Sequence, residues 1–400
     1  MRIGMMVDVY KSHVSGITTY ISINKLELER RGHEVYIFTF GDLDQDDQET
    51  KVIRSPGLPL LDTGYYLSLK YNREARRLLA SMDIAHVHHP FVSGAMALRY
   101  CKPRGIPIIF TNHTRYDLYA HTYLPIVPDV IGSTALETYM QYFCRSVDLT
   151  ISPSPGMRDV LVKFGITSKI DVVPNGVDLA PYRQVIQPID RSSLGFNPDD
   201  IVLIYTGRLG PEKNLPFLLR SFGGTAQAYE NVRLLLVGDG PERDNLEDRV
   251  KLMGLQSKVR FTGMVPYAEI PRYLATSDAF ITASVTEVHP FTVIEAMASG
   301  LPVLGISSPG VGDSINDGET GYIVDEEDLA AFTAKMVRLV TQHDERRRMG
   351  DQARTSAERY SLENTVQMMV ERYEMVAAQA LSRKRSFRAR YSRFLDGIGL

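Results

Sequence analysis

Residues 201–214 read IVLIYTGRLGPEKN, and this stretch decides how the rest of the chain is interpreted. Its first six residues form a near-continuous apolar run, which is typical of a strand buried on both faces of a parallel sheet. A glycine-containing turn then leads into a helical pattern. Because a strand, a turn and a helix in this order make up the repeating unit of doubly wound α/β domains, the stretch predicts that architecture.

The same order of strand, turn and helix recurs along the whole chain in two series. The apolar runs of the first series are Ile3–Val9, Val35–Phe40, Ile84–Val87, Ile106–Phe110 and Leu149–Ile151. Those of the second series are Ile201–Thr206, Leu234–Val237, Val259–Phe261, Ala279–Ile281 and Pro302–Ile306. Two such series predict two Rossmann-like α/β domains that face a central cleft. Ligands of open parallel sheets bind outside the carboxyl ends of the strands, so the cleft is the expected site.

Five segments follow from these patterns. The first domain is expected over 1–181 and the second over 201–360, with a polar, proline-bearing stretch at 182–200 as the linker. A helical pattern at 361–381 comes next and can cross back to brace the first domain. The last residues, 382–400, form a basic tail.

The composition is that of a globular protein, with 44% apolar and 23% charged residues. A net charge of −3 gives no reason to expect a nucleic-acid partner. The two cysteines, Cys101 and Cys144, form no CxxC pair, so we expect reduced thiols in a cytosol. No apolar run approaches the roughly 18–20 residues needed to cross a bilayer, and the start of the chain has no signal-peptide pattern. These features predict a cytoplasmic protein.

The turn that follows residue 206 is suited to a diphosphate. Gly207 lets the backbone come close to phosphate oxygens, and the start of the next helix offers unpaired N–H groups. Arg208 can grip a diphosphate with its planar guanidinium, and Lys213 adds a compact positive charge. Both would stabilise the negative charge that develops when a glycosidic bond to a diphosphate breaks. The alternative is that the two cations are ordinary surface residues beside a turn.

A second strand-to-helix turn, at residues 237–241, reads VGDGP. On this pattern we assign Gly238, like Gly207, to the donor-binding set. Many α/β domains have such a turn without a ligand, so a tight structural turn is an equal alternative.

Residues 287–295 read EVHPFTVIE and lie between a predicted strand and a helix rich in small residues. Two acids eight positions apart across such a loop can face different parts of one ligand. We assign Glu295 to the two hydroxyls of a ribose and Glu287 to the hydroxyls of a sugar. The donor-binding residues between them, close to the diphosphate, are His289, Pro290, Phe291 and Thr292. The alternative, in which Glu295 lies on a solvated helix face, conflicts with its apolar neighbours, because a buried carboxylate needs partners.

These motifs resemble those of a large glycosyltransferase family with the GT-B fold, often called family 4, whose retaining members carry a Glu-x7-Glu motif. The strand-end Arg208 and Lys213, the VGDGP turn and the PNGVD turn at 174–178 match as well. The resemblance extends over nearly the whole chain. It implies a nucleotide-sugar donor, retention of the anomeric configuration, and no required metal or other cofactor. The absence of a convincing strand-end Asp-x-Asp motif agrees with the last point.

The first half supplies further candidates through the same resemblance. Gly16, in the sequence SGI at 15–17, occupies the place of a glycine loop against the donor phosphate. The family often has two glycines at this place, and this chain has one. His113, at the end of a predicted strand, corresponds to a histidine that lines the cleft beside the donor sugar.

His86, His88 and His89 form a second histidine group at the end of a predicted strand. Three histidines in four positions suggest a metal site. Strand alternation, however, places His86 and His88 on one face and His89 on the other, and no pair of acids stands nearby to complete a site. Lining of the cleft and a purely structural role are the remaining interpretations.

A narrower resemblance concerns residues 113–121, which read HTRYDLYAH. The segment is similar to a stretch of bacterial diacylglycerol glucosyltransferases, as is the opening of the chain. Those enzymes transfer glucose from UDP-glucose to the free hydroxyl of diacylglycerol at the membrane face. The resemblance implies acceptor contacts by Tyr116 and His121.

The basic tail carries a separate signal. Its apolar residues fall at helical spacing on one face and are Phe387, Tyr391, Phe394, Leu395 and Ile398. Its basic residues are Arg383, Lys384, Arg385, Arg388, Arg390 and Arg393. A basic helix with aromatic anchors suits an anionic membrane surface, where each basic residue contributes about 1 kcal/mol. The alternatives are a disordered, solubilising tail and a helix docked on an acidic face of the protein.

Together these features predict a retaining glycosyltransferase that transfers a hexose, glucose by the resemblance, from a UDP-sugar to a hydroxyl of a lipid such as diacylglycerol. It would act as a peripheral protein on the inner face of the cell membrane. Its catalytic residues would be Arg208, Lys213, Glu287 and His113. Phosphatidylinositol or a soluble sugar is the alternative acceptor. Two rival classes are a nucleotide-sugar epimerase and a non-catalytic nucleotide-sugar binding protein.

Overall fold

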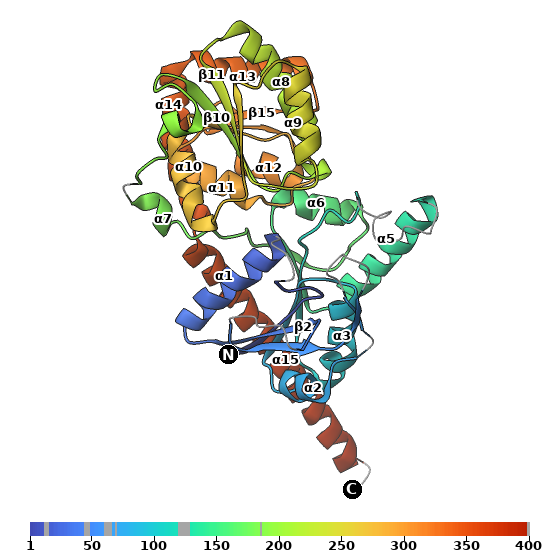
Figure 1. Cartoon of the computed structure of the whole chain (residues 1–400). Helices are drawn as coiled ribbons and strands as arrows, with labels where there is room; N and C mark the ends of the chain where they lie inside the picture. The colour runs from blue at the N-terminus through green and yellow to red at the C-terminus, as the bar shows by residue number, and fades with distance from the viewer. Residues whose placement is uncertain are drawn as a thin grey trace. The chain divides into compact units, whose positions relative to one another are not determined.

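The computed structural model describes residues 1–11, 16–43, 49–59, 66–68, 70–118, 129–184 and 186–397, with the side chains of these residues except 67, 129–133 and 384–397. The chain forms two compact units (Figure 1). The first unit contains Met1–Pro153, Arg158–Gly176 and Leu362–Leu400, and the second contains Ser154–Met157 and Val177–Ser361.

The first unit is built on a seven-stranded sheet with the order β3-β2-β1-β6-β7-β8-β9. All of its strand pairs are parallel. The strands are β1 (Arg2–Met6), β2 (Glu34–Phe40), β3 (Val52–Ser55), β6 (Ile84–Val87), β7 (Ile108–Thr111), β8 (Leu149–Ser152) and β9 (Ile170–Val172). The central strands β1, β6, β7 and β8 are buried almost throughout, as expected for apolar runs covered on both faces. A separate antiparallel pair joins β4 (Leu58–Pro59) to β5 (Tyr66–Leu67).

Helices cover both faces of this sheet. They are α1 (Gly16–Arg30), α2 (Arg73–Leu79), α3 (Val92–Tyr100), α5 (Asp129–Ser146), α6 (Pro155–Lys163) and α15 (Leu362–Gly397), with a 3-10 turn, η2 (Lys102–Arg104). The residues of α6 are divided between the two units. Figure 1 shows α1 and α15 against one face of the sheet and α2 and α3 against the other.

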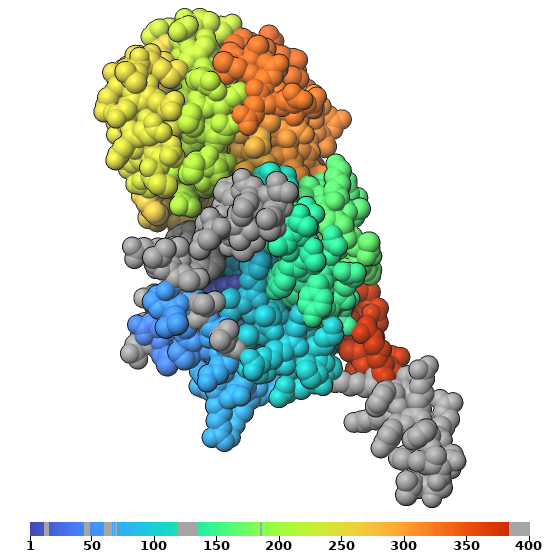
Figure 2. All heavy atoms as spheres, turned by 90° about the vertical axis from the view of Figure 1, so that its right-hand side faces the viewer, coloured from blue at the N-terminus to red at the C-terminus, as the bar shows by residue number. Residues whose placement is uncertain are grey.

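The C-terminal helix α15 is anchored to the first unit by polar contacts along its length. Near its start, the Arg31 guanidinium donates to the Gln367 side chain over 2.7 Å. Further along, the Arg372 guanidinium lies 3.6 Å from the Asp171 carboxylate, and that of Arg383 lies 2.7 Å from the Asp148 carboxylate. Figure 2 shows the red surface of α15 next to the segment that contains β9. The helix continues to Gly397, beyond the 361–381 pattern.

The second unit is built on a six-stranded parallel sheet with the order β12-β11-β10-β13-β14-β15. Its strands are β10 (Ile201–Thr206), β11 (Val232–Val237), β12 (Val259–Gly263), β13 (Ala279–Ile281), β14 (Val303–Ile306) and β15 (Gly321–Val324). Its helices are α7 (Ala180–Arg183), α8 (Leu215–Ala228), α9 (Arg243–Leu252), α10 (Ile270–Thr276), α11 (Phe291–Ala298), α12 (Pro309–Ser314), α13 (Leu329–Thr341) and α14 (His343–Ala357). The short 3-10 helices are η3 (Arg191–Leu194), η4 (Pro211–Lys213), η5 (Tyr267–Glu269) and η6 (Glu358–Tyr360).

Each face of the second sheet has its own hydrophobic core. Side chains of α8 and α13 form one core with the strands. Side chains of α10 and α11 form the other, on the opposite face (Figure 1). Both sheets are therefore doubly wound, as the repeated strand and helix patterns predicted.

The segment 182–200, which the composition suggested as a linker, is instead part of the second unit. Tyr182, Leu194 and Phe196 are buried in the core on the α10 and α11 side. These apolar residues have no regular spacing and lie among polar residues, so the sequence pattern did not indicate that the segment is buried. The second unit accordingly begins before the first strand of its own sheet.

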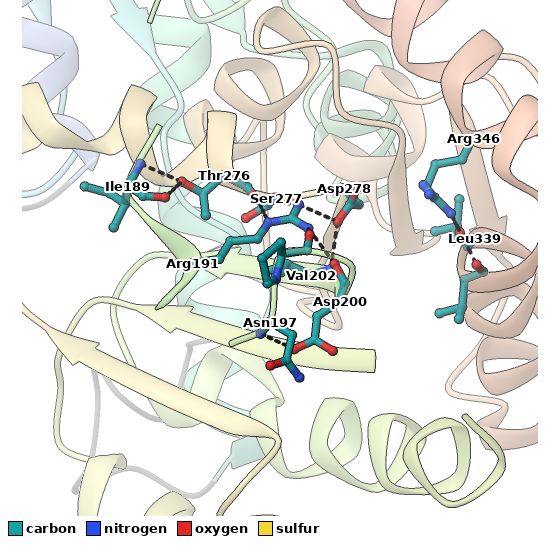
Figure 3. A network of polar contacts seen from close by, with 12 residues as sticks. Ile189, Arg191, Asn197, Asp200, Val202, Thr276, Ser277, Asp278, Leu339 and Arg346 are labelled. Atoms are coloured by element: carbon teal, nitrogen blue, oxygen red, sulfur yellow. Dashed lines mark hydrogen bonds and ion pairs between the residues drawn. The ribbon is translucent and has the colours of Figure 1, made fainter. Parts of the chain in front are cut away.

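Arg191 ties this segment to the sheet (Figure 3). The Arg191 guanidinium donates to the Asp200 carbonyl over 2.6 Å and to the Thr276 carbonyl over 2.8 Å. It also pairs with the Asp278 carboxylate over 2.9 Å. The same carboxylate oxygen accepts the N–H of Val202 in β10 over 2.8 Å. Arg191 thus joins the entry segment to the start of β10 and to the end of α10.

Both cysteines are free and buried. Burial raises the pKa of each thiol to about 12, so neither is a reactive thiolate near neutral pH. In the part of the chain that the structure describes, no helix is long and apolar enough to span a bilayer.

Replacing Arg191 with alanine should destabilise the second unit by about 2–4 kcal/mol, because it leaves a half-buried carboxylate and several carbonyls without their donor. Urea unfolding followed by circular dichroism measures the change. Lys251→Ala is a suitable control, since Lys251 pairs with Asp248 and both side chains are more than half exposed. The control should change stability by at most about 0.5 kcal/mol. Equal stability of the two variants would contradict the tethering role of Arg191.

Candidate active site

The carboxyl end of β10 presents the predicted diphosphate-binding cations. Gly207 follows the strand with φ +142°, a conformation that side chains disfavour. Arg208 is exposed, and its guanidinium makes no hydrogen bond or ion pair with the residues that the structure describes. Lys213 lies in η4 and is half-buried. A guanidinium and an ammonium that follow the same strand are groups that can bind an anionic oxygen.

Glu287 and Lys213 form an ion pair. The Lys213 ammonium lies 2.6 Å from a carboxylate oxygen of Glu287, although the two residues are 74 positions apart. The loop that carries Glu287 is held at its backbone, because the N–H of Gly310 donates to the Glu287 carbonyl over 3.1 Å. The structure thus brings together two residues that the sequence analysis assigned to one ligand from separate motifs.

Glu295 is the most deeply buried acid of the predicted site, at 3% exposure. It lies in α11, and its carboxylate accepts a hydrogen bond of 2.7 Å from the Tyr267 hydroxyl. Tyr267 is in turn hydrogen-bonded by Tyr182. Burial raises the pKa of Glu295 to about 7, and the bond from Tyr267 opposes this only in part. A buried carboxylate of this kind gains from hydroxyl donors such as those of a ribose.

Tyr267 is a residue that the sequence analysis missed. It belongs to the turn after β12 and is 57% exposed, so its ring faces solvent while its hydroxyl contacts Glu295. A large aromatic ring in an exposed turn is the one signal in the sequence that could have indicated it.

The start of α11 provides N–H groups for an anion. Pro290 occupies the N-cap position, and no described side chain caps the helix. The first turn, which includes Phe291 and Thr292, therefore keeps backbone donors available. His289 differs from these neighbours, since its side chain is buried and packs edge-on against Tyr360 with ring centroids 4.9 Å apart. Burial lowers the pKa of His289 to about 3, so its ring is a neutral packing element.

The glycine at 238 has a packing explanation. Its φ is +136°, and a Cβ atom there would lie 2.0 Å from the carbonyl oxygen of Gly207. The two strand-end turns approach so closely that a side chain at 238 is excluded. The conformation at 238 therefore accounts for the glycine without any ligand.

In the first unit, His113 follows β7 and is half-buried. Its Nε2 lies 3.0 Å from Nδ1 of His88. Tyr116 is buried at 2% exposure, with its ring edge-on to Phe91, which is a packing role. Gly16 begins α1, and a Cβ atom at this glycine would meet no atom within 4 Å. His121 lies outside the described residues.

The histidine group begins within β6, and His86 and His89 are held by protein partners. His86 is hydrogen-bonded through Nδ1 to the Tyr373 hydroxyl and through Nε2 to the Thr111 hydroxyl, each over 2.7 Å. His89 accepts the backbone N–H of Asp8 at its Nδ1 over 3.2 Å. Among the described residues no group of three or more histidines, cysteines or acids is arranged to hold a metal ion.

The two doubly wound α/β units have the fold of the GT-B glycosyltransferases. Residues 186–356 match the family described as glycosyl transferases group 1, and residues 14–181 match glycosyltransferase family 4. The chain belongs to this glycosyltransferase family and is a glycosyltransferase.

Several relatives are similar over most of the chain. The alpha-monoglucosyldiacylglycerol synthase of Streptococcus pneumoniae is 32% identical, over 82% of this chain and 77% of its own length. The enzyme of the same name from Acholeplasma laidlawii is 29% identical, over 82% of this chain and 86% of its own length. A D-inositol 3-phosphate glycosyltransferase of Rhodococcus opacus is 28% identical, over 90% of this chain and 85% of its own length.

Solved structures share the fold. Anabaena HepE in complex with UDP has a TM-score of 0.76 at 18% identity, covering 94% of this chain and 100% of that protein. Sucrose-phosphate synthase from Thermosynechococcus elongatus has a TM-score of 0.75 at 19% identity, covering 94% of this chain and 99% of that protein.

The raised pKa of Glu295 predicts a pH-dependent stability. Its pKa is about 7 in the folded protein against an ordinary value of 4.5, so the unfolded chain releases this proton first as the pH rises. The contribution of Glu295 to stability therefore falls between about pH 4.5 and pH 7 and stays low above that range. Glu295→Gln should remove this loss and stabilise the protein by up to about 3 kcal/mol at alkaline pH.

Urea unfolding of wild type and Glu295→Gln at about pH 5 and about pH 8 measures this difference, which should be larger at the higher pH. Glu326→Gln, at an exposed acid, is the control and should show no such change between the two conditions. A Glu295→Gln variant that is less stable than wild type at the higher pH would refute the burial argument.

Proposed function

We propose that this glycosyltransferase transfers a hexose, glucose in the first place, from a UDP-sugar to the hydroxyl of a diacylglycerol-type lipid, with retention of configuration. The observation that carries the donor part is the Lys213–Glu287 ion pair beside the exposed Arg208 at the carboxyl end of β10. It supplies positive charge for a diphosphate and a fixed carboxylate for sugar hydroxyls within the same unit.

Each donor-side residue has a distinct task in the proposed reaction. Arg208 and Lys213 bind the diphosphate and stabilise the charge that grows on it as the bond to the sugar breaks. Glu287 accepts hydrogen bonds from the sugar hydroxyls while its ion pair holds Lys213 in place. Glu295 accepts the ribose hydroxyls, taking over from the Tyr267 hydroxyl that it now binds.

The chemical step needs no strong base from the protein. The bond from the anomeric carbon to the diphosphate oxygen breaks, and the acceptor oxygen forms its bond to that carbon on the same face. The acceptor proton passes to the departing diphosphate oxygen. Catalysis then rests on positioning and charge stabilisation, which preorganised cations provide.

The acceptor proposal is supported by the names of the relatives and by the 113–121 segment. Two relatives are named alpha-monoglucosyldiacylglycerol synthases, at 32% and 29% identity. A second candidate acceptor is an inositol phosphate, since another relative, 28% identical over 90% of the chain, is named a D-inositol 3-phosphate glycosyltransferase. No metal or other cofactor enters the proposal.

The proposed function is tested by offering the purified full chain labelled UDP-glucose, UDP-galactose and GDP-mannose, each with diacylglycerol in mixed micelles, phosphatidylinositol, inositol phosphate or no acceptor. We expect label from UDP-glucose in the lipid phase only with diacylglycerol. Arg208→Ala and Lys213→Ala should each lower turnover by roughly 10²-fold, the usual cost of removing a transition-state charge donor. Lys251→Ala, at an exposed lysine, should leave turnover unchanged.

Three outcomes would overturn the proposal. Transfer to inositol phosphate but not to diacylglycerol would select the second acceptor. Conversion of the donor sugar to its epimer without acceptor would indicate an epimerase. Binding of the donor without any turnover would indicate a nucleotide-sugar binding protein.

We further propose that the protein acts as a peripheral protein on an anionic membrane surface through its C-terminal tail. The side chains after Arg383 lie outside the described residues, so the support comes from the five basic residues of 384–400 and the aromatic residues among them. Arg383 itself pairs with Asp148 in the first unit.

Deleting residues 384–400 should therefore reduce binding to anionic vesicles and slow transfer to diacylglycerol presented in them, while hydrolysis of the donor stays unchanged. Because exposed charges are screened over about 8–10 Å at physiological ionic strength, the binding of the intact chain should weaken as salt is added. Co-sedimentation with neutral and anionic vesicles measures both effects. A second variant, with the five basic residues changed to glutamine, keeps the tail and removes its positive charge, so it separates the effect of charge from that of deleting the segment. Equal vesicle binding by all three forms would dismiss the tail as an anchor.

A further inference from the structure

We infer that His88 is a positioning residue that fixes the tautomer of His113, so that His113 presents its Nδ1–H as a hydrogen-bond donor to a substrate oxygen. The geometry of the two rings carries this inference. Only the identity of that oxygen, a sugar or acceptor hydroxyl, rests on the proposed function.

The two histidines are in direct contact. Nδ1 of His88 lies 3.0 Å from Nε2 of His113. His88 is fully buried, with 0% exposure, and its other ring nitrogen, Nε2, has no hydrogen-bond partner among the residues that the structure describes. The ring of Tyr20 packs edge-on against both imidazoles, with centroids 5.7 Å from His88 and 4.7 Å from His113. Tyr20 therefore covers one side of the pair and limits the access of water to its hydrogen bond.

Both imidazoles are neutral near physiological pH. Burial lowers the pKa of His88 and of His113 well below the ordinary histidine value, and the neighbouring His86 and His89 lower them further. The Asp8 carboxylate raises the pKa of His89, and it accepts the N–H groups of Val92 and Ser93 at the start of α3. A neutral imidazole carries one proton, on one of its two nitrogens.

The position of the proton on His88 follows from its surroundings. A proton on Nε2 would be a buried N–H without an acceptor, and such groups are rarer and more costly than an unfilled lone pair. A proton on Nδ1 has His113 as its acceptor. His88 therefore donates through Nδ1, and His113 accepts through Nε2.

The tautomer of His113 is then determined. Its Nε2 is an acceptor, so its single proton must lie on Nδ1. Nδ1 of His113 has no hydrogen-bond partner among the described residues, and the residue is half-buried. His113 thus offers an N–H donor and cannot remove a proton through this atom. This role agrees with a transfer in which the departing diphosphate takes the acceptor proton.

His86 also contacts the His88 ring. Its ring lies 4.2 Å from that of His88, centroid to centroid. Because both of its nitrogens are bonded, to Tyr373 and to Thr111, His86 does not compete for the proton of His88. Because Tyr373 lies in α15, its hydrogen bond to His86 also connects the C-terminal helix to this group of histidines.

The experiment reads the tautomer directly by NMR of the full chain labelled with 15N-histidine, with His113 assigned by comparison with a His113→Gln sample. We expect a proton on Nδ1 of His113 in the wild type. In His88→Leu, which lacks the donor, the proton should move wholly or partly to Nε2 of His113. In His88→Asn, whose amide N–H can take the place of Nδ1–H, the wild-type tautomer should return. His343→Asn, at an exposed histidine of α14, is the control and should change nothing.

Activity is the second measurement. Loss of one oriented hydrogen bond should lower kcat/KM of His88→Leu about 10-fold, with His88→Asn within about threefold of wild type. A proton on Nε2 of His113 in the wild type, or an unchanged His113 tautomer in a folded His88→Leu, would overturn the inference. Because the tautomer is measured on the free protein, a wild type with the expected Nδ1 proton but without transfer to lipid would refute the proposed function and leave this inference standing.

Discussion

A parallel strand that is buried on both faces has no side chain to offer to a ligand except at its ends. This constraint shapes both units of the protein, because each is a parallel sheet covered by helices on both faces. The proposed catalytic residues all lie in the segments that follow strands. Arg208 follows β10, Glu287 and Glu295 follow β13, and His113 follows β7. Chemistry is confined to these positions because the strands themselves are filled by the core.

Placing polar groups next to such a core brings a desolvation cost, and the protein meets it in different ways. Lys213 and Glu287 neutralise each other across a short ion pair. Glu295 accepts a hydrogen bond from the Tyr267 hydroxyl and has its pKa raised to about 7, so further hydrogen-bond donors would stabilise its carboxylate. The histidines of the first unit stay neutral instead, and neutral rings must divide donor and acceptor roles between their nitrogens. In the second unit, the buried Glu295 carboxylate is thus suited to the hydroxyl groups of a nucleotide. In the first unit, the neutral histidines are suited to a directed hydrogen bond.

Several polar contacts outside the candidate site fix helices and connecting segments within the two units. Arg191 fixes the segment before β10 to the strands, and Arg372 and Arg383 fix α15 to the first unit. Arg346, buried at 6% exposure, donates to carbonyls at the end of α13. Arg191 and Arg346 satisfy buried backbone carbonyls, and Arg372 and Arg383 pair with carboxylates of the first unit, so these four residues are structural although they are charged.

The sequence alone determined the doubly wound architecture, because apolar runs of strand length that alternate with helical patterns have few other solutions. It also determined the family, since the Glu-x7-Glu spacing and the strand-end cations lie within short local segments. Only the tertiary structure decided the contacts between segments far apart in the chain. It assigned 182–200 to the second unit through the irregularly spaced Leu194 and Phe196, and it gave Gly238 a packing role against Gly207. It paired Glu295 with Tyr267 and His88 with His113, because no local spacing specifies which side chains meet when separate strand ends are brought to one edge of a sheet.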